Sequence, residues 1–145
     1  MNINIKFFIF LSFVSFNIIA DELIINLSGQ TKAGVLSLAI YDNARAYDLS
    51  VRGEKRSEEG IFSAIESYIE LEDGHQFIVS LPKGEYAIAL FVDANKNLKI
   101  DKNFLGIPKE QYGFSNNAMG KLSAPSYEQA KFLVQGTTVQ NIKLK

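Results

Sequence analysis

Residues 86–92 read Tyr86-Ala-Ile-Ala-Leu-Phe-Val92 and lead directly into an acid and amide run, Asp93-Ala-Asn95-Lys-Asn97-Leu-Lys-Ile-Asp101. The first part is apolar on both faces of a period-two pattern, which is typical of a central strand in a β-sandwich. From Lys102 to Pro125 the sequence has neither a strand period nor a helix period. Compact domains rarely contain so long an irregular connection unless it has a role or is tied down. We therefore expect the functional site in this connection.

Short strand patterns bounded by turn residues account for most of the remaining chain. Apolar alternation predicts further strands at residues 23–27, 35–41, 61–71, 75–81, 131–134 and 139–145. The first two are expected to pair as a hairpin, and Asp73-Gly74 is a hairpin turn signal between the next two. Seven short strands and almost no helix period predict one all-β domain, an antiparallel β-sandwich of immunoglobulin-like or transthyretin-like kind.

Two segments between the predicted strands differ from this pattern. Residues 45–60 are expected to form an exposed loop, because residues 52–59 mix charges densely and contain no apolar side chain. Residues 125–129 are expected to form one helical turn, since Ser126 and Gln129 stand at the spacing of a capping box.

Residues 1–20 have the layout of a secretory signal peptide. A short basic start with Lys6 precedes an apolar run, and the small residue Ala20 precedes Asp21. We expect cleavage between Ala20 and Asp21, which leaves residues 21–145 as a single periplasmic or secreted domain. An uncleaved anchor is the weaker interpretation, because the apolar run falls short of the ~20 residues of a bilayer span. We therefore expect no membrane span after cleavage.

Composition excludes several kinds of site and partner. The chain has no cysteine and a single histidine, His75, so disulfides, thiol catalysis and histidine-rich metal sites are excluded. Without Lys6, fourteen basic residues face sixteen acidic ones, and no basic stripe predicts a nucleic-acid partner. We expect a monomer whose partner is an unidentified ligand or protein of the cell envelope.

The acid and amide run has the spacing of a calcium loop. Asp93, Asn95, Asn97 and Asp101 occupy relative positions one, three, five and nine, and the carbonyl of Lys99 occupies position seven. Calcium takes six to eight oxygen ligands, and such spacing lets alternate groups of a curled loop converge. Leu98 stands where an EF-hand has glycine, and Phe104 stands where it has its bidentate glutamate. Glu110 or Asn103 would have to fold back to replace that ligand. The alternative is a turn in which these side chains bond their own backbone.

The following segment combines aromatic, amide and acidic side chains. Aromatic rings beside amides and a carboxylate are able to line a sugar or peptide groove. The candidate ligand-binding residues are Glu110, Tyr112, Phe114, Ser115, Asn116 and Asn117. The alternative is that the apolar residues of the loop are a satellite core that pins it to the sandwich, and that the polar ones satisfy the loop's own amides. The apolar set is Phe104, Leu105, Ile107, Tyr112 and Phe114.

Catalytic patterns are sparse. A serine nucleophile needs a base, and His75 lies in another predicted strand with no elbow motif near any serine. Asp101 and Glu110 are the carboxylate pair that would have to perform acid–base chemistry, although acidic pairs in loops are more often ligands or solvated charges. The leading hypothesis is a non-catalytic binding or structural module. The alternative is a small hydrolase or lyase that acts on cell-envelope glycan through Asp101 and Glu110.

The loop and its flanks resemble one bacterial family. The resemblance rests on Leu81-Pro-Lys-Gly-Glu-Tyr-Ala-Ile-Ala89, on Asp93 to Asp101, and on Gly106 to Asn117 with Pro125-Ser-Tyr-Glu-Gln-Ala130. These segments are similar to the exported family called domain of unknown function 2141, which usually carries glycines where this chain has Lys96 and Leu98. The resemblance implies an exported β-sandwich with no established activity, in which the long loop is the distinguishing feature.

Overall fold

The computed structural model describes residues 20–53, 60–72 and 74–145. The expected signal peptide therefore lies outside the described residues except for Ala20, as do most of the charged stretch 52–59 and Asp73 of the expected turn. Within the described part, no helix is both long and apolar enough to cross a bilayer.

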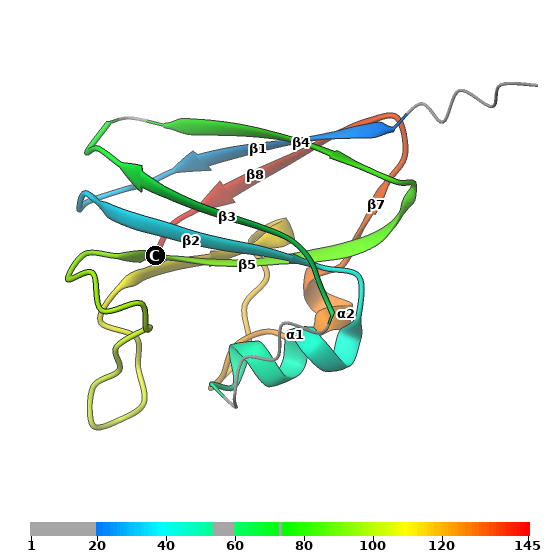
Figure 1. Ribbon diagram of the computed structural model, residues 1–145. Coiled ribbons are helices and arrows are strands. Elements are labelled where there is room, and N and C mark those ends of the chain that lie inside the picture. Colours follow the sequence, from blue (N-terminus) through cyan, green and yellow to red (C-terminus); the bar gives the residue numbers. More distant parts are fainter. Residues whose placement is uncertain (1–19, 54–59, 73) are drawn as a thin grey trace, which may run out of the picture.

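The described chain folds into two β-sheets packed face to face (Figure 1). One sheet has three strands in the order β4-β1-β8, and the other has the order β3-β2-β5-β6, with the short strand β7 beside the start of β5. The strands are β1 (Asp21–Ser28), β2 (Gly34–Tyr41), β3 (Ile61–Ile69), β4 (His75–Leu81), β5 (Gly84–Asp93), β6 (Gln111–Phe114), β7 (Phe132–Val134) and β8 (Thr137–Lys143). Three short helices complete the fold: α1 (Ala44–Val51), the 3₁₀ turn η1 (Ser115–Asn117) and α2 (Tyr127–Ala130). The predicted all-β sandwich is confirmed.

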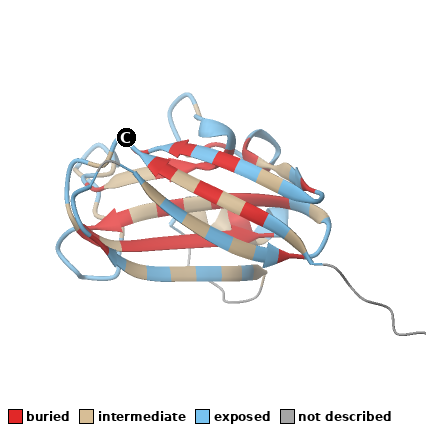
Figure 2. Ribbon diagram, turned by 90° about the horizontal axis from the view of Figure 1, so that it is seen from above, coloured by how far each residue is buried: buried red, intermediate tan, exposed pale blue. Residues whose placement is uncertain are grey.

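The main core lies between the two sheets and follows from the period-two pattern of the strands. Burial alternates along β1 and β8, whose inward side chains enter this core, whereas β2 and β5 are buried over most of their length; Figure 2 shows both patterns. Fully or almost fully buried members include Leu23, Ile25, Leu36, Leu38, Ile40, Ile88, Leu90, Val92 and Ile142. Each such side chain stabilises the fold by about 1.5–3 kcal/mol relative to an exposed one.

A second apolar cluster covers the opposite face of the five-stranded sheet. There α1 and α2 pack below the sheet (Figure 1), and they bring Tyr47 and Tyr127 into edge-to-face contact with ring centroids 5.8 Å apart. The small residues Ala39 of β2 and Ala87 of β5 leave room for these rings. Strand β5 is therefore buried on both faces, as its sequence predicts.

Strand pairing differs from the expectation in three ways. The first two strands do not form a hairpin, because β1 pairs with β4 and β8 while β2 pairs with β3 and β5. The strands β3 and β4 also belong to different sheets, so the turn between them crosses the sandwich. The pair β1–β8 is parallel, so the sandwich is not wholly antiparallel. Period-two alternation identifies a buried face but does not name the neighbouring strand.

Helix α1 corrects the expectation of an exposed loop over residues 45–60. Asn43 caps its first turn, since its Oδ1 accepts a hydrogen bond from the Ala46 N–H at 3.1 Å. The predicted helical turn after Pro125 is confirmed as α2, where the Ser126 N–H donates to Gln129 Oε1 at 2.9 Å. An eighth strand, β6, forms within the long connection that was expected to be irregular.

Candidate functional site

The acid–amide loop, residues 93–101, curls around the side chain of Asp93. Asp93 is the last residue of β5 and is 1% exposed. Its Oδ2 accepts a hydrogen bond from the Leu98 N–H at 2.7 Å, and its Oδ1 accepts one from the Asn97 N–H at 3.3 Å. These bonds hold Lys96 and Leu98 at φ values of 61° and 62°, which side-chain-bearing residues rarely adopt. The carboxylate of Asp93 is thus the centre on which the loop is built.

Asn95, Asn97 and Asp101 also converge. The side-chain amides of Asn95 and Asn97 donate to Asp101 Oδ2 at 2.6 and 3.0 Å. Their oxygens accept from the N–H groups two residues further on, Asn97 and Lys99, at 3.1 and 2.9 Å. This arrangement is that of consecutive Asx turns, which the sequence offered as the alternative to a metal loop.

Glu110 folds back onto the acid–amide loop. It is 8% exposed, and its Oε2 accepts a hydrogen bond from the Asp101 N–H at 3.1 Å. Its Oε1 is buried without a hydrogen-bond partner among the described residues. Asn103 does not fold back, because its side-chain oxygen accepts from the Leu105 and Ile107 N–H groups. Of the two residues expected as replacements for the glutamate of relative position twelve, the structure brings Glu110 and not Asn103 against the loop.

The two buried carboxyl groups have opposite pKa shifts. Burial would raise the pKa of Asp93, but the backbone N–H groups of Leu98, Lys96 and Asn97 outweigh it and lower that pKa below the ordinary value. Burial raises the pKa of Glu110, and the charges of Asp93 and Asp101 raise it further, against the hydrogen bond from the Asp101 N–H. Without a cation, ionised Glu110 is therefore a destabilising group.

We expect Glu110→Gln to raise the free energy of unfolding by about 1 kcal/mol at pH 7 in chelator. The folded pKa of Glu110 lies above its unfolded value, so its stabilising effect is complete below that unfolded value and is lost as pH rises through the folded pKa. The gain should therefore shrink toward pH 4. Urea unfolding between pH 4 and pH 8 measures it, with the exposed Glu22→Gln as control. An equal gain at every pH would contradict the prediction.

Among the described residues, no group of three or more acidic or histidine side chains is arranged to hold a metal ion by itself. A cation bound here would need amide and main-chain oxygens as well, which is common for calcium. Asn95 and Asn97 would have to rotate their amides so that oxygen rather than nitrogen faces Asp101. Such a rotation exchanges donor for acceptor at little steric cost.

A comparison with protein families places this loop in a wider group. The family described as "Uncharacterized protein conserved in bacteria (DUF2141)" matches residues 25–142, which include the whole site and nearly all of both sheets. The chain belongs to this family. Comparisons with curated proteins and with solved structures gave no match.

In this DUF2141 protein, two residues of the acid–amide loop have positive φ angles. The resemblance implies glycines at the positions of Lys96 and Leu98, and these are two of the four non-glycine residues with positive φ in the described chain. Glycine adopts this conformation without steric cost, whereas other residues are strained in it. In this chain Lys96 and Leu98 adopt that conformation although neither is glycine.

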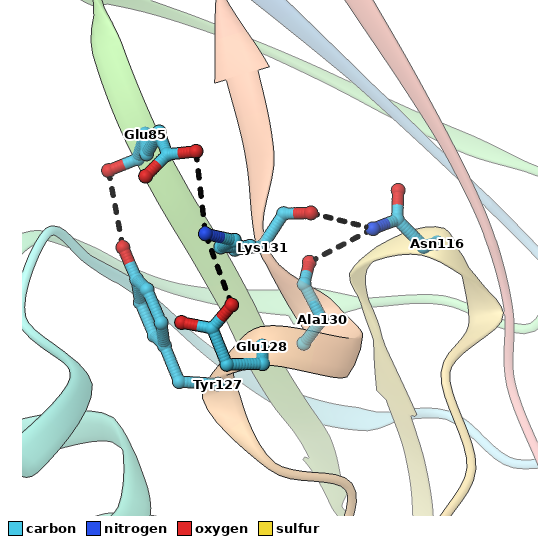
Figure 3. Close-up of polar contacts among 6 residues, drawn as sticks. All are labelled: Glu85, Asn116, Tyr127, Glu128, Ala130 and Lys131. Carbon is cyan, nitrogen blue, oxygen red and sulfur yellow. Dashed lines mark hydrogen bonds and ion pairs between the residues drawn. The ribbon is translucent and has the colours of Figure 1, made fainter.

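The polar residues after β6 are engaged in the framework of this DUF2141 protein. Ser115 is fully buried, and its hydroxyl accepts from the Ile88 N–H at 2.8 Å and donates to the Ala130 carbonyl at 2.6 Å. The Asn116 amide donates to the carbonyls of Ala130 and Lys131 at 3.1 and 2.8 Å (Figure 3). Figure 3 also shows the Lys131 ammonium between Glu85 and Glu128, at 3.4 and 3.0 Å. Together these contacts tie η1 to α2 and β5.

Asn117 covers the free edge of β8. Its amide donates to the Asn141 carbonyl at 2.8 Å, and its oxygen accepts from the Lys143 N–H at 2.8 Å. One side chain thus bonds two backbone groups that another strand would otherwise use. Tyr112 and Phe114, with ring centroids 5.9 Å apart, lie beside Asn117 at a surface depression too shallow to enclose a water molecule.

The apolar residues before Glu110 are not a satellite core. Phe104, Leu105 and Ile107 are 95%, 67% and 53% exposed. They lie on a hairpin, residues 101–109, that extends from the acid–amide loop and is closed by a bridge between Lys102 and Pro108. The sequence signals for this hairpin were Asn103 and Gly106, which are both turn formers. Apolar character alone suggested burial, and the structure overturns that expectation.

Proposed function

We propose that this protein is an exported, non-catalytic β-sandwich module of the bacterial envelope. In this proposal the connection between Asp93 and Asn117 forms the surface that binds a ligand of the envelope. A calcium ion organises the acid–amide loop at the start of this connection. The observation that carries the proposal is the buried Glu110, whose Oε1 has no hydrogen-bond partner in the described part of the chain and whose pKa is raised by burial and by Asp93 and Asp101. A divalent cation would relieve this unfavourable grouping of negative charge.

The oxygen groups around the loop are consistent with calcium. Three carboxylates, Asp93, Asp101 and Glu110, come from the two ends of the connection. The amide oxygens of Asn95 and Asn97 and the carbonyl of Lys99 would complete the set, which approaches the six to eight oxygens that calcium takes. Calcium also tolerates irregular geometry better than magnesium does, and this loop departs from the EF-hand order by taking Glu110 from outside it.

Several features argue against the glycan hydrolase alternative. Glu110 is 8% exposed, so a substrate would need the loop to open before reaching it. Asp101 already accepts two amide hydrogen bonds on one oxygen. His75 bonds the Glu70 carbonyl at 3.0 Å and starts a strand of the other sheet. These contacts support a module that binds rather than one that performs acid–base chemistry.

Export is proposed from the layout of residues 1–20. The start of β1 at Asp21 supports the proposed cleavage site, because cleavage after Ala20 would leave the entire strand in the mature protein.

The test of the calcium site is thermal unfolding after chelation, with and without 10 mM calcium. Extracellular calcium modules bind with dissociation constants near 10⁻⁴–10⁻³ M. At a hundredfold excess over the dissociation constant, binding to the folded state adds about 2.7 kcal/mol to the free energy of unfolding. For a domain of this size we expect the unfolding temperature to rise by roughly 10 °C.

Asp101→Asn should abolish that rise, because it removes a charged ligand and keeps the shape of the side chain. The matched control is Glu22→Gln, which removes one negative charge from the exposed start of β1. It should leave the calcium response intact. Equal unfolding temperatures with and without calcium in the wild-type protein would reject the calcium site and leave the loop as a set of Asx turns.

A further inference from the structure

We propose that the hairpin of residues 101–109 inserts its apolar tip into the surface of an anionic lipid bilayer. The proposal rests on the proposed function in one respect, since the hairpin belongs to the connection that was proposed to bind. It adds the class of partner, a membrane surface.

The hairpin is an ordered structure whose backbone is largely satisfied internally. The Asn103 N–H donates to the Ile107 carbonyl at 2.8 Å, and the Gly106 N–H donates back to the Asn103 carbonyl at 2.9 Å. Asn103 Oδ1 accepts from the Leu105 and Ile107 N–H groups at 2.9 and 3.0 Å. The Lys109 N–H donates to the Asp101 carbonyl at 2.8 Å and closes the base. Backbone groups that enter an apolar medium must be paired in this way.

The side chains at the tip are apolar and unusually exposed for a folded domain. Phe104 is 95% exposed, Leu105 67% and Ile107 53%. These three residues lie within positions 104–107, and the fourth position is Gly106, which takes the turn conformation at φ 77°. Single exposed apolar residues are ordinary, but a contiguous group marks a binding or membrane surface.

The charges next to the tip are positive. The hairpin begins at the acidic Asp101, but its part from Lys102 to Lys109 carries two lysines and no acidic residue, although the chain as a whole carries a formal charge of −1. Lys109 and the neighbouring Lys99 are exposed, while the Lys102 ammonium lies near Gly53 at the end of α1. Lysines beside an apolar tip are attracted to an anionic surface and reach its headgroups while the apolar residues enter it.

The shape of the hairpin favours a bilayer over a protein groove. Figure 1 shows the segment before β6 projecting away from both sheets, so it forms a protrusion. A protein partner would need a matching apolar hollow, whereas a bilayer interface accepts any apolar protrusion with basic flanks.

The experiment measures sedimentation with vesicles of phosphatidylglycerol and phosphatidylethanolamine, and with neutral phosphatidylcholine vesicles. The full chain is expressed with its own leader and purified as the bacterium leaves it, and mass spectrometry defines its N-terminus. We expect binding to the anionic vesicles. The double variant Phe104→Ser/Leu105→Ser should bind at least about tenfold more weakly. Lys99→Glu/Lys109→Glu should weaken binding by about tenfold or more.

The matched control is Leu122→Ser, which removes a fully exposed apolar side chain, at 102% relative exposure, from another loop. It should leave vesicle binding unchanged. All of these positions are exposed, so circular dichroism should show an intact fold in every variant. Because all variants carry the same N-terminus, a retained leader would not imitate the difference between them.

Three results would overturn the proposal: no binding of the wild-type protein to anionic vesicles, equal binding by the serine double variant, or equal binding to neutral vesicles. Phe104-dependent self-association or capture of an envelope protein without vesicle binding would likewise reject a bilayer in favour of a protein surface. Each vesicle measurement is repeated in chelator. Binding that persists there, with no thermal response to calcium, would reject the calcium site while the membrane proposal stands.

Discussion

Replacing Ser115 with alanine should lower the free energy of unfolding by about 3 kcal/mol, an effect as large as losing a core side chain. The hydroxyl is fully buried and is a partner of the Ile88 N–H on β5. Alanine would leave this N–H buried and unpaired, which costs about 1–3 kcal/mol, and would remove the bond to the Ala130 carbonyl. The Ala130 carbonyl keeps the Asn116 amide as a second partner, so losing the bond from the hydroxyl costs less than leaving the Ile88 N–H unpaired. The unfolding temperature should fall by roughly 10 °C.

The control for this measurement is Ser123→Ala on the exposed loop before α2. The Ser123 hydroxyl bonds only the neighbouring Ala124 carbonyl, at 3.2 Å, so its removal should change the free energy of unfolding by less than about 0.5 kcal/mol. If Ser115→Ala were equally mild, the hydroxyl would not be the link between β5 and α2.

The sequence predicts where the strands lie but not which strands are neighbours in a sheet. Alternating apolar residues located the strands well, because burial of one face leaves a period of two. They did not identify partners: β1 and β2 look like a hairpin, yet Gly34 begins β2 in the other sheet, where it faces Ile69 of β3. Pairing depends on which strands meet in space, and no local pattern records it.

The candidate site was predicted in part. The structure brings the side chains of Asn95, Asn97 and Asp101 together, because alternate residues of a curled loop share one side, while Asp93 bonds the loop backbone; a metal ion at these residues stays a prediction. From the sequence, either Glu110 or Asn103 was expected to fold back onto the acid–amide loop. Only the three-dimensional path of the hairpin shows that Glu110 does so. Burial was misjudged at Phe104, because composition does not distinguish an apolar residue in a core from one on a protruding tip.

The carboxylate of Asp93 has two roles: it accepts hydrogen bonds from the loop backbone, and in the proposed function it binds calcium. Asp93→Ala should lower the free energy of unfolding by about 3 kcal/mol in chelator, because the Leu98 and Asn97 N–H groups lose their acceptor. The strained φ values of Lys96 and Leu98 would then lack the contact that holds them. Relief of Glu110 from a neighbouring charge offsets part of this loss. Urea unfolding beside Asp101→Ala, which loses only exposed hydrogen bonds and should cost about 1 kcal/mol, measures the contrast.

The substitution Asp93→Asn separates the two roles of this side chain. Its remaining oxygen still accepts a backbone hydrogen bond, so the protein should regain roughly half of the stability that Asp93→Ala loses. Its charge is gone, so the thermal response to calcium should be absent. A variant that keeps both stability and the calcium response would show that neither role of this side chain needs its negative charge. Stability without the response would identify the carboxylate as a ligand, because the backbone that it organises would still be in place.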